Sequence, residues 1–256
     1  MLMKIPQLPT LREMFEAGVH FGHKKQYSDA RGRDNFFGVR DKIVIINLEK
    51  TRTALQNALE FLAAEAAKGS TFLFVGTKSQ ARVQIKKISA ELEMPYVVNR
   101  WLGGTLTNFE TIERNLKKLN QLEEALNDAN SPMTKKEKTV LKRTIERARF
   151  NLSGMQNLKR LPDVLVIFDA AREALAIKEA EAMDIPVVAI MDTNANPHGV
   201  TYPIPANDDI DSSLDLVTDL MITTIKDNYR AAQENAPAQS GKAEEVQKQP
   251  VAVGSK

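Results

Sequence analysis

Cysteine is absent from this 256-residue chain, and histidine occurs only three times. Disulfide bonds and thiolate metal sites are therefore excluded. The only imidazole ligands are His20, His23 and His198. The first two lie three residues apart, which would place them together on a helix, but no third ligand accompanies them nearby. We expect a packed or hydrogen-bonded pair, with no metal site and no cofactor.

Long apolar runs are also missing. No stretch approaches the roughly 20 residues that span a bilayer, and the first ten residues lack the continuous apolar core of a secretory signal. Hydrophobic residues make up 43% of the chain, enough to bury a core. We expect a cytoplasmic protein with no membrane partner.

Glycine motifs for nucleotides do not occur either. The chain has neither the Walker pattern G-x-x-x-x-G-K-[ST] nor the dinucleotide pattern G-x-G-x-x-G. The segment FVGTKSQAR offers one glycine and Lys78 at a strand end, and NRWLGGTLTNF offers the adjacent Gly103 and Gly104. Such glycines either cradle a phosphate or permit a tight turn, and the isolated pair favours the turn.

Asp169 and Asp192 each follow a predicted parallel strand, at the edge where α/β proteins commonly place a site. They could hold Mg²⁺ or act as acid and base, but no nucleophile and oxyanion donors can be assembled beside them. We expect each to accept hydrogen bonds from the following helix start, and the run NDDIDSSLD, 207–215, to cap a helix. A nucleotide-handling α/β enzyme that uses Lys78, Asp169 and Asp192 is the alternative function.

Apolar segments alternate with helical ones over most of the chain. Runs of β-branched residues without polar alternation are typical of strands covered on both faces, and the intervening helices supply right-handed crossovers. The predicted strands are TFLFVGT, YVVNRW, LPDVLVIFDA, IPVVAIMDT and YPIPAND. The fold class is therefore α/β, with a doubly wound, mainly parallel sheet.

The first 70 residues carry a different pattern. The segment LREMFEAGVHFG predicts a short amphipathic helix over 11–22 that ends at Gly22. Alternation and β-branching over 35–48 predict two short strands that turn near Arg40 and Asp41. A further helix runs to Gly69.

A long polar insertion interrupts the sheet pattern. Apolar residues recur at threes and fours in two stripes, which predicts an antiparallel α-helical coiled-coil hairpin about 30 Å long over 107–158. Asn130-Ser131-Pro132 ends its first helix, and Thr134 with Glu137 forms a capping box for the second. The α/β domain then comprises 1–106 and 159–230, and 231–256 form a disordered tail because they hold almost nothing apolar.

Charge is distributed unevenly along the chain. Residues 1–160 carry 28 Lys and Arg against 17 Asp and Glu, whereas 161–256 carry 7 against 16. A one-sided basic surface suits a polyphosphate partner, because each neutralised phosphate releases condensed counterions. We expect the basic side chains to gather into one continuous face.

The segment HKKQYSDARGRDNFFGVR, 23–40, interleaves cations with aromatic rings in a loop-prone context. Cations for phosphates and flat rings for unstacked bases are the chemistry of RNA recognition, although Phe36 and Phe37 also suit a strand core. The residues expected to bind RNA are Lys24, Lys25, Arg31, Arg33, Arg40, Lys78, Arg100, Lys135, Lys136, Lys142 and Arg143.

Several segments in this order resemble the bacterial S-two family of small-subunit ribosomal proteins. They are VHFGHKKQY, VRDKIVIINLEKT, FLFVGTKSQAR, NRWLGGTLTNFETI, LPDVLVIFDA, EAMDIPVVAIMDTNANP and IPANDD. The resemblance covers about 11–230. One departure lies after His23, where the family usually reads aromatic, Asn, Pro, basic, Met, and this chain has Ser28 to Gly32.

The resemblance implies an α/β domain with a protruding coiled-coil hairpin and a structural, non-catalytic role. Its implied partners are 16S rRNA and neighbouring small-subunit proteins, including the large mRNA-binding one, with no small-molecule substrate. It also favours the joint at Gly103-Gly104: Trp101 anchors the chain, and Thr105, Thr107 or Asn108 caps the first hairpin helix. A protein scaffold that binds no RNA remains a third possibility.

Overall fold

A computed structural model describes residues 3–128 and 133–235 of the chain. At its centre is a five-stranded sheet in the order β5-β4-β6-β7-β8, and every neighbouring pair is parallel. The strands are β4 (Phe72–Val75), β5 (Tyr96–Val97), β6 (Val164–Phe168), β7 (Val187–Met191) and β8 (Tyr202–Pro205). The predicted parallel sheet is confirmed, although β5 is shorter than the expected YVVNRW.

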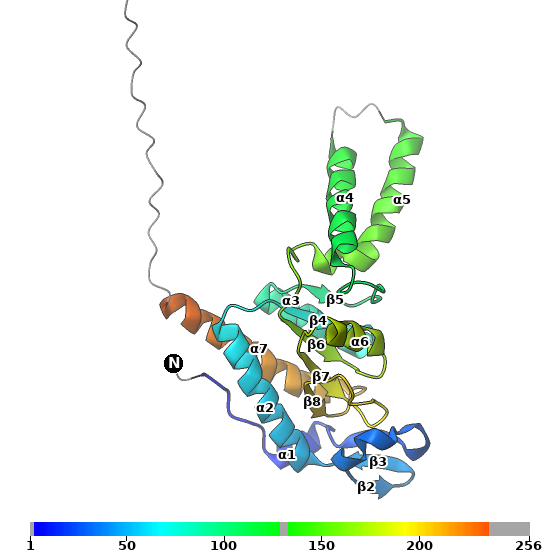
Figure 1. The fold of residues 1–256 in the computed structure, drawn as a ribbon. Helices are drawn as coiled ribbons and strands as arrows, with labels where there is room; N and C mark the ends of the chain where they lie inside the picture. Colours follow the sequence, from blue (N-terminus) through cyan, green and yellow to red (C-terminus); the bar gives the residue numbers. More distant parts are fainter. Residues whose placement is uncertain (1–2, 129–132, 236–256) are drawn as a thin grey trace, which may run out of the picture.

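Helices cover both faces of this sheet (Figure 1). One layer consists of α2 (Leu48–Ala67), α3 (Ser79–Leu92) and α7 (Asp211–Asn235), and α6 (Ala174–Ala182) lies on the other side. Successive side chains of a strand point to opposite faces. Accordingly, Phe72 and Phe74 pack with Leu55 of α2, whereas Leu73 and Val75 belong to the apolar cluster that includes Ile177 of α6. The sheet is thus doubly wound, as predicted.

A second, antiparallel sheet lies beside the carboxyl edge of the first. It is ordered β1-β3-β2 and consists of β1 (Phe21–Lys24), β2 (Phe36–Arg40) and β3 (Ile43–Ile46). Two 3-10 helices, η1 (Lys25–Tyr27) and η2 (Ala30–Asn35), join β1 to β2. The turn between β2 and β3 has positive φ at Asp41 and Lys42, so the predicted position of the turn is confirmed.

The first helix is shorter than predicted. Helix α1 (Leu11–Glu16) begins with a capping box between Thr10 and Glu13, and the chain turns at Gly18, where φ is +78°. Residues Phe21 and Gly22 already belong to β1. The expected helix to Gly22 was wrong because glycine adopts the left-handed turn at position 18 without a steric penalty.

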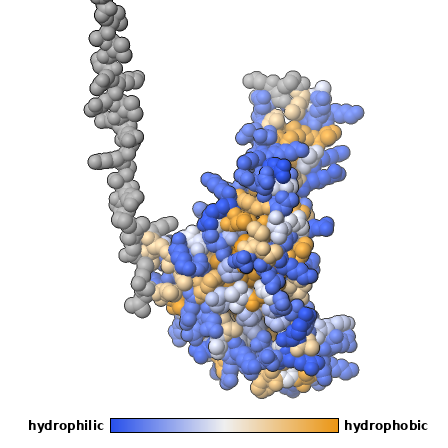
Figure 2. All heavy atoms as spheres, in the orientation of Figure 1, coloured by the Kyte–Doolittle hydropathy of each residue, from blue (hydrophilic) through white to orange (hydrophobic). Residues whose placement is uncertain are grey.

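Two helices project from the sheet side by side, α4 (Phe109–Asn127) and α5 (Lys135–Leu152) (Figure 1). The predicted capping box between Thr134 and Glu137 is present. The predicted helix end at Asn130-Ser131-Pro132 lies outside the described residues. Figure 2 shows hydrophobic residues between hydrophilic ones along these helices. The apolar stripes bury Ile112, Leu116, Leu119, Ile145 and Leu152.

At the carboxyl end of the described chain, α7 continues to Asn235, so the first five residues of the predicted disordered tail, 231–235, are helical. Residues 236–256 of the predicted tail lie outside the description. Across residues 3–128 and 133–235, none of the helices combines the length and apolarity that a bilayer crossing requires.

Candidate functional site

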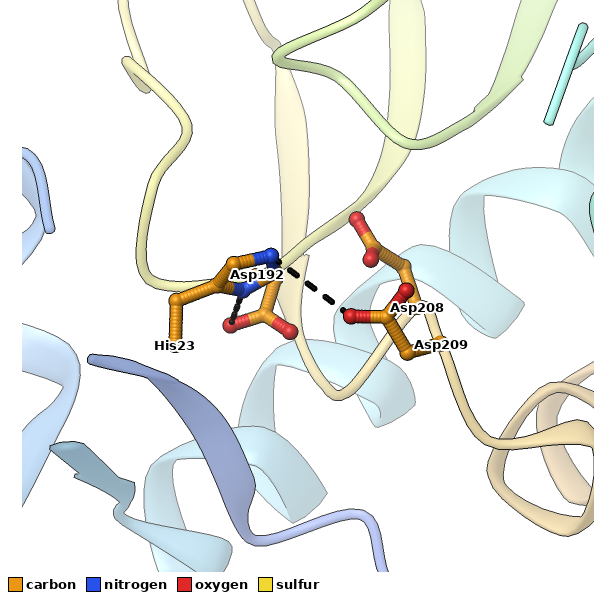
Figure 3. Close-up of side chains that lie close together, drawn as sticks. All are labelled: His23, Asp192, Asp208 and Asp209. Atoms are coloured by element: carbon orange, nitrogen blue, oxygen red, sulfur yellow. Dashed lines mark ion pairs between the residues drawn. The ribbon is translucent and has the colours of Figure 1, made fainter. Parts of the chain in front are cut away.

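A cluster of charged side chains lies where the two sheets meet (Figure 3). His23 comes from β1, Asp192 follows β7, and Asp208 and Asp209 follow β8. His23 Nδ1 is 3.1 Å from Asp192 Oδ1, and His23 Nε2 is 3.5 Å from Asp209 Oδ2. One candidate ligand atom from each of the four residues lies within 4.8 Å of the others. The carboxyl ends of adjacent parallel strands meet at one edge, which explains how distant acids converge here.

Strand β1 packs closely against the large sheet, and this packing places the imidazole of His23 at the carboxyl edge of that sheet. His23 N donates to Thr193 Oγ1 at 2.9 Å, and Asn207 Nδ2 donates to the Phe21 carbonyl at 2.6 Å. Between them, Gly22 leaves no space for a side chain, since a Cβ there would lie 2.5 Å from Thr193 Cγ2. The glycine therefore permits the contact between the two sheets.

Burial and neighbouring charges shift the pKa values of two groups in this cluster, Asp208 and His23. Asp208 is 1% exposed, and its desolvation, together with the charges of Asp169 and Asp192, raises its pKa to about 7. Lys78 opposes this shift, with its Nζ 2.6 Å from Asp208 Oδ1. The contact with Asp192 raises the pKa of His23, although burial lowers it in part. Negative charge is thus concentrated here, and Lys78 and His23 only partly balance it.

The donor set suits a divalent metal ion. An imidazole and three carboxylates match the ligands that zinc accepts, and two buried oxygens, Asp192 Oδ2 and Asp208 Oδ2, have no hydrogen-bond partner among the described residues. No metal site was predicted, because no third ligand accompanies His20 and His23 in the sequence. The further candidate ligands are at positions 192, 208 and 209, which the sheet topology brings to His23.

His20 and His23 do not form the expected pair. The ring of His20 packs between Phe15 and Phe21, with ring centroids 4.2 and 4.0 Å away, and burial lowers its pKa. The packed interpretation of His20 is confirmed. The expectation that both imidazoles share a helix was wrong, because His23 lies on β1.

The Trp101-to-Asn108 loop holds a buried carboxylate. Glu179 of α6 accepts hydrogen bonds from Trp101 Nε1 at 3.0 Å, from the Gly104 amide at 2.8 Å and from the Leu106 amide at 2.9 Å. Gly104 adopts φ +86°, as a tight turn requires. Asn108 occupies the N-cap position of α4, but its side chain makes no capping bond. The predicted joint is confirmed, and Glu179 is the partner that the sequence analysis missed.

At the end of β4, the amide and hydroxyl of Thr77 also donate to a buried carboxylate, that of Glu173. Glu173 is 3% exposed, and its Oε1 accepts from the Thr77 amide at 2.9 Å and from Thr77 Oγ1 at 2.5 Å. Desolvation raises the pKa of this carboxyl, and the bonds from Thr77 oppose that rise. Asp169 Oδ1 accepts from the Arg172 amide in the turn that leads into α6, so its expected role is confirmed. Asp192 Oδ1 accepts from the adjacent Thr193 amide, but β8 and not a helix follows it, so the expected helix start at Asp192 was wrong.

The predicted RNA-binding residues fall into separate groups. Lys24, Lys25, Arg31, Arg33 and Arg40 lie on or beside the small sheet. Lys135, Lys136, Lys142 and Arg143 lie on α5, at the opposite end of the molecule (Figure 1). Arg100 is near the hairpin base, where its neighbour Asn99 donates to the Phe150 carbonyl. The expected single continuous face is therefore not formed.

Ion pairing differs between these groups. Arg31 lies 2.6 Å from Asp29, and this contact lowers the pKa of Asp29 to about 2. Lys78 Nζ is also 2.5 Å from Asp209 Oδ1, so it belongs to the acidic cluster. The four predicted cations of α5 are exposed and make no ion pair with any residue in the described ranges. Lys24, Lys25 and Arg33 beside the small sheet are likewise exposed and without an ion pair among the described residues, so both groups are available to an external anion.

The comparisons with known proteins agree with this architecture. The model of the family described as "Ribosomal protein S2" matches residues 14–228. The chain belongs to this family. It is also 43% identical over 208 residues to a relative in Sulfurimonas denitrificans named "Small ribosomal subunit protein uS2", an alignment that covers 81% of this chain and 80% of the relative.

Membership in the ribosomal protein S2 family settles the choice between enzyme and structural protein. The family is a structural ribosomal one, so the chain is not an enzyme. The geometry agrees, because donors that could meet a phosphate at the end of β4 and in the Gly103-Gly104 loop are occupied by Glu173 and Glu179. The nucleotide-handling alternative is thereby overturned.

Proposed function

We propose that this protein is a structural constituent of the small ribosomal subunit that binds 16S rRNA in the cytoplasm. The observation that carries the proposal is the row of exposed cations on α5, which make no ion pair in the part of the chain that the structure describes. Its further partners are neighbouring small-subunit proteins, including the large mRNA-binding one. It takes no small-molecule substrate.

Binding through these cations follows the physics of phosphate neutralisation. Each Lys or Arg that meets a phosphate releases condensed counterions, so affinity falls steeply with salt and depends little on base sequence. Within the described ranges, Lys135, Lys136, Lys142 and Arg143 have no carboxylate partner to give up on binding. The group near the small sheet, with Lys24, Lys25 and Arg33, supplies a second contact region, in which Arg31 and Arg40 already face Asp29 and Asp41.

The hairpin is the arm that carries this contact. We assign 107–158 to a coiled-coil insertion and 1–106 with 159–230 to the α/β domain. Contacts between α4 and α5 and the buried Leu116, Leu119 and Ile145 support packing of the two apolar stripes. A stiff arm holds its cations at a fixed distance from the sheet, which suits recognition of a folded RNA by shape.

We also propose that His23, Asp192, Asp208 and Asp209 hold a divalent cation with a structural role. The cation would neutralise carboxylates that Lys78 balances only in part, and it would tie β1 to the carboxyl edge of the large sheet. Because a ligand that binds only the folded state raises the free energy of unfolding, the site would stabilise the junction between the sheets.

Cofractionation with small ribosomal subunits at moderate salt tests the main proposal. The wild-type chain is expected in the subunit fraction, and a variant with Lys135, Lys136, Lys142 and Arg143 changed to Gln is expected to be depleted from it while keeping its thermal melt. The matched control removes four cations that already face carboxylates elsewhere: Arg12, Lys68, Lys87 and Lys226, all changed to Gln. Equal depletion of both variants would show a net-charge effect and contradict a specific role for α5.

A further inference from the structure

The outward face of α5 carries an exposed aromatic ring among its cations. Phe150 is 59% exposed, whereas Ile145 and Leu152 of the same helix are buried at 3% and 6%. Residues three and four apart share one face of a helix, so Arg147 and Glu146 lie next to Phe150, and Arg143 lies one turn further. These four side chains and Asn151 line a shallow, open groove of about 440 Å³.

The ring is held at a well-anchored end of the helix. The Phe150 carbonyl accepts a hydrogen bond from Asn99 Nδ2, which ties this turn to the loop after β5. Gly154, just beyond the helix, packs so closely that a Cβ there would lie 2.2 Å from the Tyr96 carbonyl oxygen. Met155 is buried at 1%. The backbone under Phe150 is thus held in place, and it presents the exposed ring at a defined position on the helix.

The charges around the Phe150 ring indicate which kind of partner this groove suits. Arg143 and Arg147 form no ion pair within the described parts of the chain, and residues 135–160 contain nine Lys and Arg against Glu137 and Glu146 only. A protein partner that covered Phe150 would have to supply carboxylates for both guanidinium groups. A nucleotide supplies a flat ring for stacking and phosphates for the cations in one unit.

We propose that this groove binds an unpaired RNA nucleotide, with its base stacked on Phe150 and its flanking phosphates at Arg143 and Arg147. The carboxylate of Glu146, on the same face, only accepts hydrogen bonds and so favours a base that presents an exocyclic amino group. This inference rests on the proposed rRNA-binding function and adds a base contact to the phosphate contacts of the hairpin.

Binding of the full chain to 16S rRNA, measured over a series of salt concentrations, tests the inference. Changing Phe150 to Leu keeps an apolar side chain but removes the flat ring, and loss of one stacked base is expected to weaken binding about 5- to 150-fold. The slope of log affinity against log salt should stay that of wild type, because no cation is lost. Phe150→Tyr should restore wild-type affinity, whereas changing Arg143 and Arg147 to Gln should flatten the slope.

The outcomes separate this inference from the proposed function. Wild-type affinity in F150L, with a normal thermal melt, would overturn the stacking site and leave rRNA binding intact. Normal rRNA affinity of F150L together with loss of a neighbouring protein from reconstituted subunits would overturn it in favour of a protein partner. Failure of the wild-type chain to bind 16S rRNA would overturn both proposals.

Discussion

Glu179 is the side chain on which the joint between the sheet and the hairpin depends. Its carboxylate is 6% exposed and accepts from the Trp101 indole, the Gly104 amide and the Leu106 amide. Changing Glu179 to Gln keeps the size of the side chain but replaces one acceptor oxygen with an NH₂ group that faces other donors. We expect this single change to destabilise the loop at the base of α4.

The magnitude follows from the lost hydrogen bonds. A buried donor left without a partner costs about 1–3 kcal/mol. Each carboxylate oxygen of Glu179 accepts from two N–H groups, and one amide oxygen of Gln can still accept, so E179Q is expected to lower the free energy of unfolding by about 2–6 kcal/mol. For a chain of this size, that loss corresponds to a fall in Tm of about 4–24 °C. E179A, which removes both acceptors, should lower Tm further.

Trp101 provides a direct assay because it is the only tryptophan of the chain and is 7% exposed. Urea unfolding followed by its fluorescence should show a lower midpoint for E179Q and a red-shifted emission in the folded baseline. The matched control is Glu181→Gln on the same helix, since the Glu181 side chain is 50% exposed and its one ion pair among the described residues is with the exposed His198, at 3.6 Å. E179Q with the midpoint and emission of E181Q would refute the reasoning.

The pH dependence of this effect has a defined sign. Burial alone would raise the pKa of Glu179, but the bonds donated by Leu106, Trp101 and Gly104 hold it below its ordinary value of 4.5. A carboxyl with a lowered folded-state pKa contributes stability above its unfolded pKa, and that contribution is lost as pH falls through the folded value. The difference in Tm between wild type and E179Q should therefore be constant near neutral pH and should narrow below pH 4.5.

Two further predictions concern the junction between the sheets. Because the folded-state pKa of Asp208 is raised to about 7, ionisation of this carboxyl should destabilise the metal-free protein as pH rises through 7. Zn²⁺ should raise the Tm of wild type at pH 8 but not that of D192N. An equal increase in the Tm of D192N on adding zinc would contradict the site. Changing Gly22 to Ala should lower the free energy of unfolding by about 1–3 kcal/mol, because the added methyl group would overpack against Thr193. Thermal melts measure this loss. An unchanged Tm would show that β1 can shift away from the large sheet.

Local and periodic patterns accounted for much of the fold. The apolar runs of β6 and β7 predicted buried parallel strands because both faces of those strands are covered by helices. The capping box at Thr134 and Glu137 was predicted because its two residues recognise each other across a single turn. Where the interaction partner lies within a few residues, or where burial is uniform, the sequence pattern is sufficient.

The candidate site was harder to predict, because its contacts join distant parts of the chain. Glu179 is separated from Gly104 by 75 positions, and Lys78 from Asp208 by 130. The sequence does not show which Lys or Arg side chains will form an ion pair with a carboxylate after folding. Lys78 therefore resembled an RNA-binding residue, and the carboxylates that lie beside His23 could not be predicted without the order of the strands.

The salt dependence of binding to 16S rRNA tests the central claim most directly. If Lys135, Lys136, Lys142 and Arg143 each neutralise a phosphate, changing all four to Gln should weaken binding at low salt and flatten the slope of log affinity against log salt by about 3. The control variant, in which paired cations elsewhere are changed to Gln, should keep the wild-type slope. Parallel slopes for the α5 variant and wild type would contradict the claim that this helix binds RNA.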